Sequence, residues 1–346
     1  MTDIKSQTLL ELQKEMEELG EPKFRAKQLY GWIHEKLVDS FDEMSNLSKP
    51  LREKLKNRYE LTALEIVKVQ KSKQDGTCKF LFRLPDGNVI ESVLMKYYYG
   101  NSVCISSQAG CRMGCRFCAS TLNGLERNLR ASEMLDQVYQ IQKWSKERVS
   151  NVVVMGTGEP LDNYDELLCF IQLLTGEGGL HISQRNITVS TCGIVPGIRR
   201  LADEKLQITL ALSLHASNQE KRRKIMPVAN KYELSEVLDA CRYYFEQTGR
   251  RITFEYSLAD GINDGREDAE ELAALLKPLN CHVNLIPINP VRERDFVQPD
   301  DHTVTNFKNK LEKSGINVTI RREMGRDIDG ACGQLRKSYM DTEKVR

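Results

Sequence analysis

Apolar residues recur at helical spacing near the start of the chain. Between residues 6 and 19, and again between 24 and 37, large apolar side chains return every three or four positions, and Pro22 separates the two runs. This spacing places the apolar side chains on one face of a helix. The pattern predicts two amphipathic helices, with a third short helix after Ser48-Lys49-Pro50.

The pattern changes to strand-like between about Leu61 and Lys96. Pro85-Asp86-Gly87-Asn88 interrupts this region, and an Asp-Gly pair favours a tight hairpin turn because it tolerates positive φ. We therefore predict a small N-terminal accessory domain over residues 1–95 that ends in a β-hairpin. Residues 96–346 form the second predicted domain.

From Val103 onward, short runs rich in β-branched residues alternate with segments of helical length. The six predicted strands are 103–107, 151–156, 186–190, 207–215, 252–258 and 281–288. The predicted helices are 131–148, 163–175, 196–204, 232–247, 265–277 and 303–313. This alternation predicts an α/β fold, a partial (β/α)6 barrel with a helical N-terminal domain and a hairpin extension. Ligands of such folds bind at the carboxyl ends of the strands.

Composition is typical of a globular protein. The chain has 346 residues, of which 40% are hydrophobic and 29% charged, with a net charge of +1. It has no uncharged apolar run long enough to span a membrane, and its first residues do not resemble a signal peptide. We therefore expect a cytoplasmic protein, in which the ten cysteines are not used for scaffold disulfides.

Three of those cysteines are clustered in a locally basic segment. Cys111, Cys115 and Cys118 follow the first predicted barrel strand. Three thiolates at this spacing can hold three corners of a 4Fe–4S cluster and leave its fourth iron open. The alternative is a zinc site in which Cys104 supplies the fourth thiolate.

Polar and glycine residues also lie at the ends of other predicted strands, where a ligand would bind. These positions are Gly156-Thr157-Gly158-Glu159-Pro160, Ser190-Thr191, Ser213-Leu214-His215 and Asn289-Pro290.

The pattern Cys111-x3-Cys115-x2-Cys118, with Phe117 before the last cysteine, resembles the cluster loop of radical S-adenosylmethionine (SAM) enzymes. The resemblance implies that the open iron binds SAM and that SAM cleavage gives a 5′-deoxyadenosyl radical. Residues 156–159 resemble the segment that holds the SAM amino group. The SAM-contacting residues that the resemblance implies are Gly158, Glu159, Ser190, Ser213, Leu214, His215 and Asn289.

From about residue 20 to Leu335 the chain is most similar to the RlmN family of dual-specificity RNA adenine-C2 methyltransferases. The segments that carry this resemblance are 106–111, 155–160, 187–191, 212–216, 283–287 and 327–335. Membership implies methylation of an adenine in 23S rRNA and of the adenine 3′ to the anticodon in some tRNAs. It also implies an electron donor such as flavodoxin or ferredoxin; we expect a monomer and no membrane partner.

The resemblance assigns three catalytic residues. Adenine C2 is electron-poor and cannot attack the SAM methyl group, whereas a carbon radical can add to it. Cys332 matches the family's methyl-carrying cysteine, and Cys104 matches the thiol that releases the product and leaves a Cys104–Cys332 disulfide. Glu91 matches a carboxylate assigned as general base or as partner of the adenine amino group.

Two other functions are compatible with these motifs. A Cfr-like adenine-C8 methyltransferase shares the cluster, Cys104 and Cys332. A non-catalytic RNA-binding protein with a four-cysteine zinc site would share only the cysteines and the local basic charge.

Overall fold

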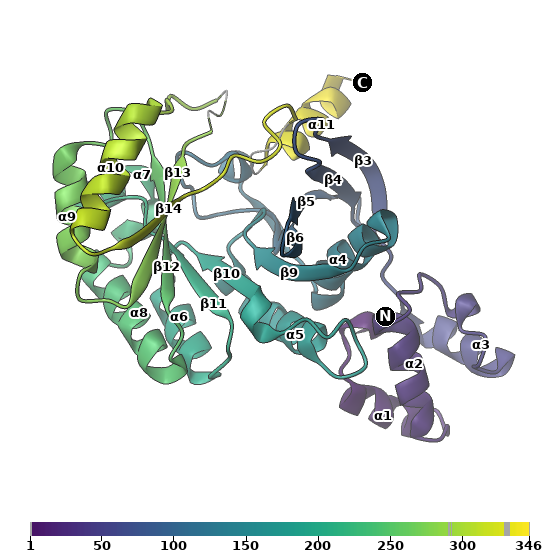
Figure 1. The fold of residues 1–346 in the computed structure, drawn as a ribbon. Coiled ribbons are helices and arrows are strands. Elements are labelled where there is room, and N and C mark those ends of the chain that lie inside the picture. The colour runs from purple at the N-terminus through teal and green to yellow at the C-terminus, as the bar shows by residue number, and fades with distance from the viewer. Residues whose placement is uncertain (1, 290, 292, 329–332, 346) are drawn as a thin grey trace.

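One curved ten-stranded sheet organises the protein. The computed structural model describes residues 2–289, 291, 293–328 and 333–345, and the strand order is β14-β13-β12-β11-β10-β9-β6-β5-β4-β3 (Figure 1). The seven strands from β14 to β6 run parallel to one another, whereas β5, β4 and β3 pair antiparallel, starting with the β6–β5 pair. The predicted α/β class is confirmed.

All six predicted barrel strands are present. They are β6 (Gly100–Ile105), β9 (Val149–Val154), β10 (Ile187–Thr191), β11 (Thr209–Ser213), β12 (Ile252–Leu258) and β13 (Cys281–Pro287). A further parallel strand, β14 (Asn317–Ile320), extends the edge beyond β13 and was not predicted. It is short and mostly exposed, so its apolar signal is weak.

Helices cover the outer face of the sheet (Figure 1). The predicted ones are α4 (Ala131–Ser145), α5 (Tyr164–Thr175), α6 (Val195–Asp203), α8 (Leu234–Thr248), α9 (Arg266–Leu276) and α10 (Asp301–Lys313). Two more, α7 (Gln219–Ile225) and α11 (Gln334–Val345), were not predicted. Highly charged helix sequences carry little apolar periodicity, and α7 is mostly charged. None of the helices in the described residues is long and apolar enough to cross a membrane.

The predicted hairpin forms part of the same sheet. Its strands are β3 (Glu65–Lys71), β4 (Cys78–Arg83) and β5 (Val89–Tyr97), and the Pro85-to-Asn88 turn joins the last two. β5 runs across residue 95 and pairs with β6, so the hairpin and the barrel strands are continuous. Leu335 of α11 packs against Leu81 and Val89, which places the C-terminal helix beside the hairpin (Figure 1).

The N-terminal residues form a small helical unit, as predicted. It contains α1 (Leu9–Glu18), α2 (Phe24–His34), α3 (Lys49–Arg58) and a two-stranded sheet of β1 (Thr2–Asp3) and β2 (Tyr59–Glu60). In the described part of the chain, short 3₁₀ helices lie at Ile4–Ser6, Phe41–Glu43, Ala119–Thr121, Pro160–Asn163, Gln184–Asn186 and Pro227–Asn230.

A buried ion pair attaches this helical unit to the barrel. Lys5 Nζ contacts Asp136 of α4, and both side chains are 1% exposed. Burial raises the pKa of Asp136, whereas Lys5 and the N–H of Leu64 act in the opposite direction. A buried carboxylate is tolerated only when its charge is compensated, so Lys5 is needed for docking.

We predict that Lys5→Met lowers the free energy of unfolding by about 3–5 kcal/mol, because it leaves the Asp136 carboxylate buried without its cation. Urea denaturation at neutral pH measures this loss. Lys23→Met is the control, since Lys23 pairs with Glu17 on the surface and should have almost no effect. The double variant Lys5→Met/Asp136→Leu should recover much of the loss; a double variant as unstable as Lys5→Met alone would contradict the electrostatic explanation.

Candidate active site

The cysteine loop is closed at its base by two short strands. β7 (Gln108–Gly110) leads into it and β8 (Leu125–Asn128) leaves it, and the two pair antiparallel. Cys111 N donates to Gly124 O at 2.8 Å. Gly110 has φ +81°, and a Cβ there would lie 2.1 Å from Gly124 O. This close backbone approach requires glycine and fixes where the first cysteine begins.

Backbone hydrogen bonds hold the rest of the loop. Cys118 N donates to Cys115 O at 3.2 Å, and Thr121 Oγ1 donates to the carbonyls of both cysteines at 3.0 and 2.9 Å. Arg116 N donates to Ile225 O at 2.9 Å, which fixes the loop to the end of α7. The second and third cysteines are thus positioned by the fold.

The thiols lie in surroundings that favour a bound cation. Cys111 and Cys115 are buried, and Cys118 is half-buried. Burial raises the pKa of Cys111 to about 12 and raises that of Cys115 further. Thiolates in such a site need a positive group to hold them ionised, which iron supplies. Within the described residues no three or more His, Cys, Asp or Glu side chains are grouped closely enough to bind a single metal ion.

The glycine-rich loop after β9 lies against the start of β7. Thr157 O accepts from Ser107 N at 2.9 Å and from Gln108 N at 3.1 Å. Gly158 has φ +115°, and a Cβ there would lie 2.7 Å from Gln108 Cβ. The predicted glycine loop and the cysteine loop therefore meet through their backbones.

The Glu159 side chain accepts hydrogen bonds from backbone N–H groups beside the glycine loop. Its carboxylate accepts from Cys192 N at 2.7 Å and from Leu161 N at 3.1 Å, and the side chain is buried. Burial raises the pKa of Glu159, while these N–H groups lower it. The side chain thereby connects the ends of β9 and β10.

The serine pair predicted after β10 and β11 is brought together. Ser190 Oγ lies 3.4 Å from Ser213 Oγ, and both side chains are half-buried. Leu214 is fully buried, its N–H donates to Glu255 O, and its carbonyl accepts from Arg222. Asn289 follows β13 and is half-buried. All the predicted SAM-contacting residues lie at the carboxyl ends of strands.

His215 is neutral and fixed. Burial lowers its pKa to about 3, and its Nδ1 accepts from Ser257 N at 2.9 Å, which leaves the proton on Nε2. Its ring packs edge-on against Phe117 with centroids 4.8 Å apart. His215 thereby supports the cysteine loop from the end of β11.

Glu91 lies where the C-terminal segment, residues 333–345, reaches the barrel. Its carboxylate pairs with buried Lys79 at 3.1 Å, and accepts from Gly333 N and, at 3.1 Å, from Arg336 N. A Cβ on Gly333 would lie 2.8 Å from Ser120 N, just after Cys118 in sequence. The C-terminal segment therefore lies between the hairpin and the cysteine loop.

Cys104 shares a sheet face with Glu91. Cys104 is opposite Val93 in the β5–β6 pair, and Glu91 lies two residues before Val93, so both side chains project to the same side. Cys104 is buried. Cys332 lies outside the described residues, although its chain neighbour Gly333 lies within them.

The local basic charge of the cysteine region is largely neutralised. Arg127 pairs with Asp86 and Glu133, Arg130 with Glu60, and Arg112 with Asp162. Charge patterning does not identify the buried cations near this site, among them Lys79 and Arg222. Arg222 lies in a run of charged residues that resembles an exposed helix.

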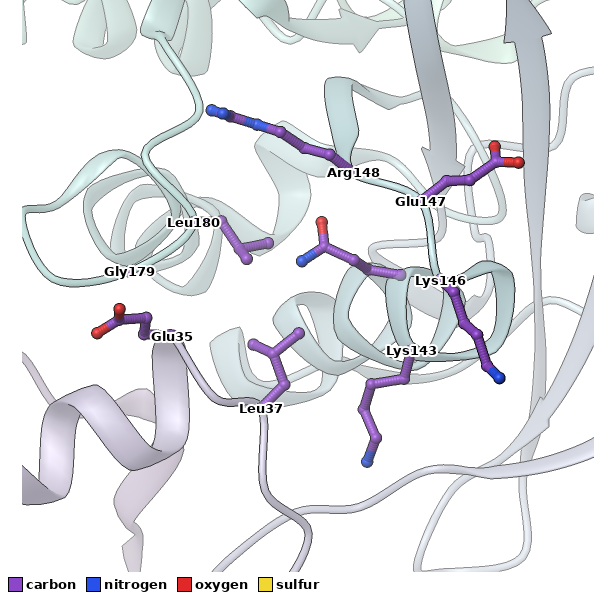
Figure 2. A pocket seen from close by; sticks show the side chains of 9 residues that line it. Glu35, Leu37, Lys143, Lys146, Glu147, Arg148, Gly179 and Leu180 are labelled. Carbon is purple, nitrogen blue, oxygen red and sulfur yellow. The ribbon is translucent and has the colours of Figure 1, made fainter.

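A surface groove lies at the other end of the barrel. Figure 2 shows it between the end of α2 and the end of α4, with Glu35, Lys143 and Arg148 among its lining residues. Because Arg148 directly precedes β9, the groove is at the amino ends of the strands, opposite the cysteine loop. It is not the candidate active site.

The fold and this arrangement define a radical SAM methyltransferase. The sequence profile described as the radical SAM superfamily matches residues 105–276, and that of the ribosomal RNA large subunit methyltransferase N-terminal domain matches residues 2–61. The crystal structure of a radical SAM methyltransferase from Sphaerobacter thermophilus aligns with a TM-score of 0.92 and 43% identity, over 96% of this chain and 99% of that one.

Two relatives named "Probable dual-specificity RNA methyltransferase RlmN" identify the family. The protein from Lachnospira eligens is 68% identical over 341 residues, and that from Lachnoclostridium phytofermentans is 64% identical over 344 residues. Each comparison covers 99% of this chain and 97% of the relative. The chain belongs to the RlmN family. It is a SAM-dependent RNA methyltransferase that uses SAM and a 4Fe–4S cluster held by three cysteines, and the non-catalytic zinc-protein alternative is wrong.

We predict that Gly158→Ala lowers the free energy of unfolding of the metal-free protein by roughly 1–3 kcal/mol, because alanine is strained at φ +115° and its Cβ meets the backbone of Gln108. SAM affinity of the iron-loaded protein should fall as well. Thermal unfolding and calorimetric titration measure the two effects. Gly31→Ala is the control: it lies inside α2 with only an ordinary contact at 3.7 Å and should be neutral or stabilising. Native stability and affinity in Gly158→Ala would contradict the role of this loop.

Proposed function

We propose that this enzyme methylates C2 of an adenine in 23S rRNA, at the peptidyl-transferase centre, and C2 of the adenine 3′ to the anticodon in some tRNAs. The observation that carries the proposal is the position of Gly333. It lies against Glu91 on one side and Ser120 of the cysteine loop on the other. This contact brings the residue that follows Cys332 beside the site where radical chemistry would start.

Cys111, Cys115 and Cys118 are the proposed cluster ligands. Their loop is held by β7, β8 and α7, and the three thiols match the soft ligands that iron–sulfur clusters require. When bound, the cluster supplies the electron that cleaves SAM and generates a 5′-deoxyadenosyl radical.

The proposed SAM site is formed by residues at the strand ends. Gly158 allows the 156–159 backbone to approach the cysteine loop, and the hydroxyls of Ser190 and Ser213 suit the ribose or carboxylate of SAM. Asn289 would add an amide after β13. Glu159, Leu214 and His215 hold the surrounding backbone in place through the hydrogen bonds described above.

Cys332 is the proposed methyl carrier and Cys104 the proposed resolving thiol. The methylene radical on Cys332 would first join adenine C2, and the adduct radical would then lose the C2 proton and one electron, which the oxidised electron-transfer partner takes up. Cys104 Sγ then attacks Cys332 Sγ. An S–S bond forms, the S–C bond breaks, and the carbon takes the electron pair and is protonated to a methyl group. The shared sheet face of Cys104 and Glu91 supports this pairing.

Glu91 is the proposed group that accepts a proton or binds the adenine amino group. Its carboxylate lies 3.1 Å from the buried Lys79 ammonium, which compensates its charge. Its contacts with Gly333 and Arg336 also make it an anchor for the C-terminal segment.

The proposal also includes the RNA substrates and an electron donor. Residues 1–95 would contribute to binding 23S rRNA and tRNA, since the profile match at 2–61 is to a domain of ribosomal RNA methyltransferases. We propose that the enzyme acts as a cytoplasmic monomer and takes electrons from a flavodoxin or ferredoxin.

The expected product is 2-methyladenosine. The reconstituted protein, incubated with SAM, a reductant and unmodified 23S rRNA or tRNA fragments, should form it, and mass spectrometry of the digested nucleosides detects it. Cys115→Ala is the negative control and should lack both iron and product. Formation of 8-methyladenosine instead would contradict the C2 assignment and favour a Cfr-like activity.

The two catalytic thiols should fail at different stages. Cys332→Ala should hold iron and bind SAM but form no covalent RNA adduct, because it cannot carry the methyl group. Cys104→Ala should form the adduct and then stall, which a denaturing gel and peptide mass spectrometry would detect. Cys241→Ala serves as a matched control, since Cys241 is buried in α8 outside the proposed thiol pair. Normal turnover by either catalytic variant would overturn the methyl-cysteine mechanism.

A further inference from the structure

A fully buried arginine lies beside the cysteine loop. Arg222 of α7 is 0% exposed. Its Nη2 donates to Cys192 O at 2.6 Å and to Ser213 O at 3.4 Å, and its Nε donates to Leu214 O at 3.3 Å. All three acceptors are neutral carbonyls at the ends of β10 and β11. The guanidinium therefore connects these strand ends, but the carbonyls do not neutralise its positive charge.

The charge of Arg222 has no acidic partner in the described part of the chain. Its Nη1 is buried and has no hydrogen-bond partner there. Burial lowers the pKa of Arg222, and the groups that oppose this effect are thiols, chiefly Cys192 and Cys115. A buried cation without a counter-charge is strongly unfavourable. A compensating negative group is therefore expected nearby.

The nearest candidate for that group is the cysteine loop. The end of α7 contacts the loop through the Arg116 N to Ile225 O hydrogen bond, and Cys115 packs with Ile225, Met226 and Cys192. Cys192, whose carbonyl accepts from Arg222, lies in the same packed cluster as Cys115. The positive charge is thus close to one of the proposed ligands.

We propose that Arg222 is a positioning residue that supplies the counter-charge for the cluster and its thiolates, and that it raises the reduction potential of the cluster. The inference rests on the proposed ligand set Cys111, Cys115 and Cys118. In the step concerned, one electron from a flavodoxin, a ferredoxin or dithionite enters the cluster, and no bond is made or broken.

The physical basis is the added negative charge of the reduced state. The three thiolates already outweigh the positive charge of the cluster core, so reduction adds charge of the same sign. A nearby buried cation stabilises the reduced form more than the oxidised form, because Coulomb interactions are strong where water is excluded. Net charge and surroundings are known determinants of iron–sulfur potentials.

The test is a redox titration of the reconstituted full-length protein, followed by electron paramagnetic resonance. Arg222→Met and Arg222→Gln should lower the midpoint potential, whereas Arg222→Lys, which keeps the charge, should stay closer to the native value. Arg250→Met is the matched control. Arg250 donates to Thr209 at the opposite end of β11, so its loss should leave the potential unchanged.

Iron retention against a chelator provides a second readout. Loss of iron from Arg222→Met and Arg222→Gln but not from Arg222→Lys supports the counter-charge role. Loss from all three variants would mean that Arg222 acts through its hydrogen bonds to the ends of β10 and β11, and would overturn the proposal. Full iron content with a native midpoint potential in Arg222→Met would also overturn the proposal. So would a shift of the midpoint potential that appears only when SAM is bound. If the native chain itself binds no iron, the proposed ligand set fails instead.

Discussion

The site depends on the backbone contact between two parallel strand ends. Thr157 O, in the loop after β9, accepts from Ser107 N and Gln108 N, in the segment that leaves β6. These hydrogen bonds place the glycine loop directly against the base of the cysteine loop. Gly156 and Gly158 allow the approach, since a Cβ on either would lie 2.7 Å from its neighbour. The carboxyl ends of β6 and β9 are thus held together through their backbones.

Charge burial determines what surrounds that unit. Lys5 and Asp136 neutralise one another where the helical unit docks, and Lys79 and Glu91 do so where the C-terminal segment meets the hairpin. Arg222 differs because its described partners are all uncharged. The other buried charges named here are compensated by a neighbouring charge. A negatively charged cluster held by the adjacent cysteine loop would compensate Arg222 in the same way.

Periodicity predicted most of the fold because it reports which face of an element is buried. The six barrel strands and the helices between them carry strong apolar patterns, and their predicted positions agree with the structure within a few residues. β14 and α7 were missed because one is short and exposed and the other is mostly charged. Neither has the buried stripe that such patterns detect.

Sequence by itself determined the chemistry of single segments: three thiols within one turn-rich loop, glycines after a buried strand, and polar groups at the ends of others. These are local properties, and spacing along the chain is enough to recognise them. Only the tertiary structure decided that Cys104 and Glu91 share a face, that Gly333 lies between the hairpin and the cysteine loop, and that Arg127 is neutralised while Arg222 is not. The physical reason is that strand register and helix packing, which bring distant residues together, depend on the whole buried core.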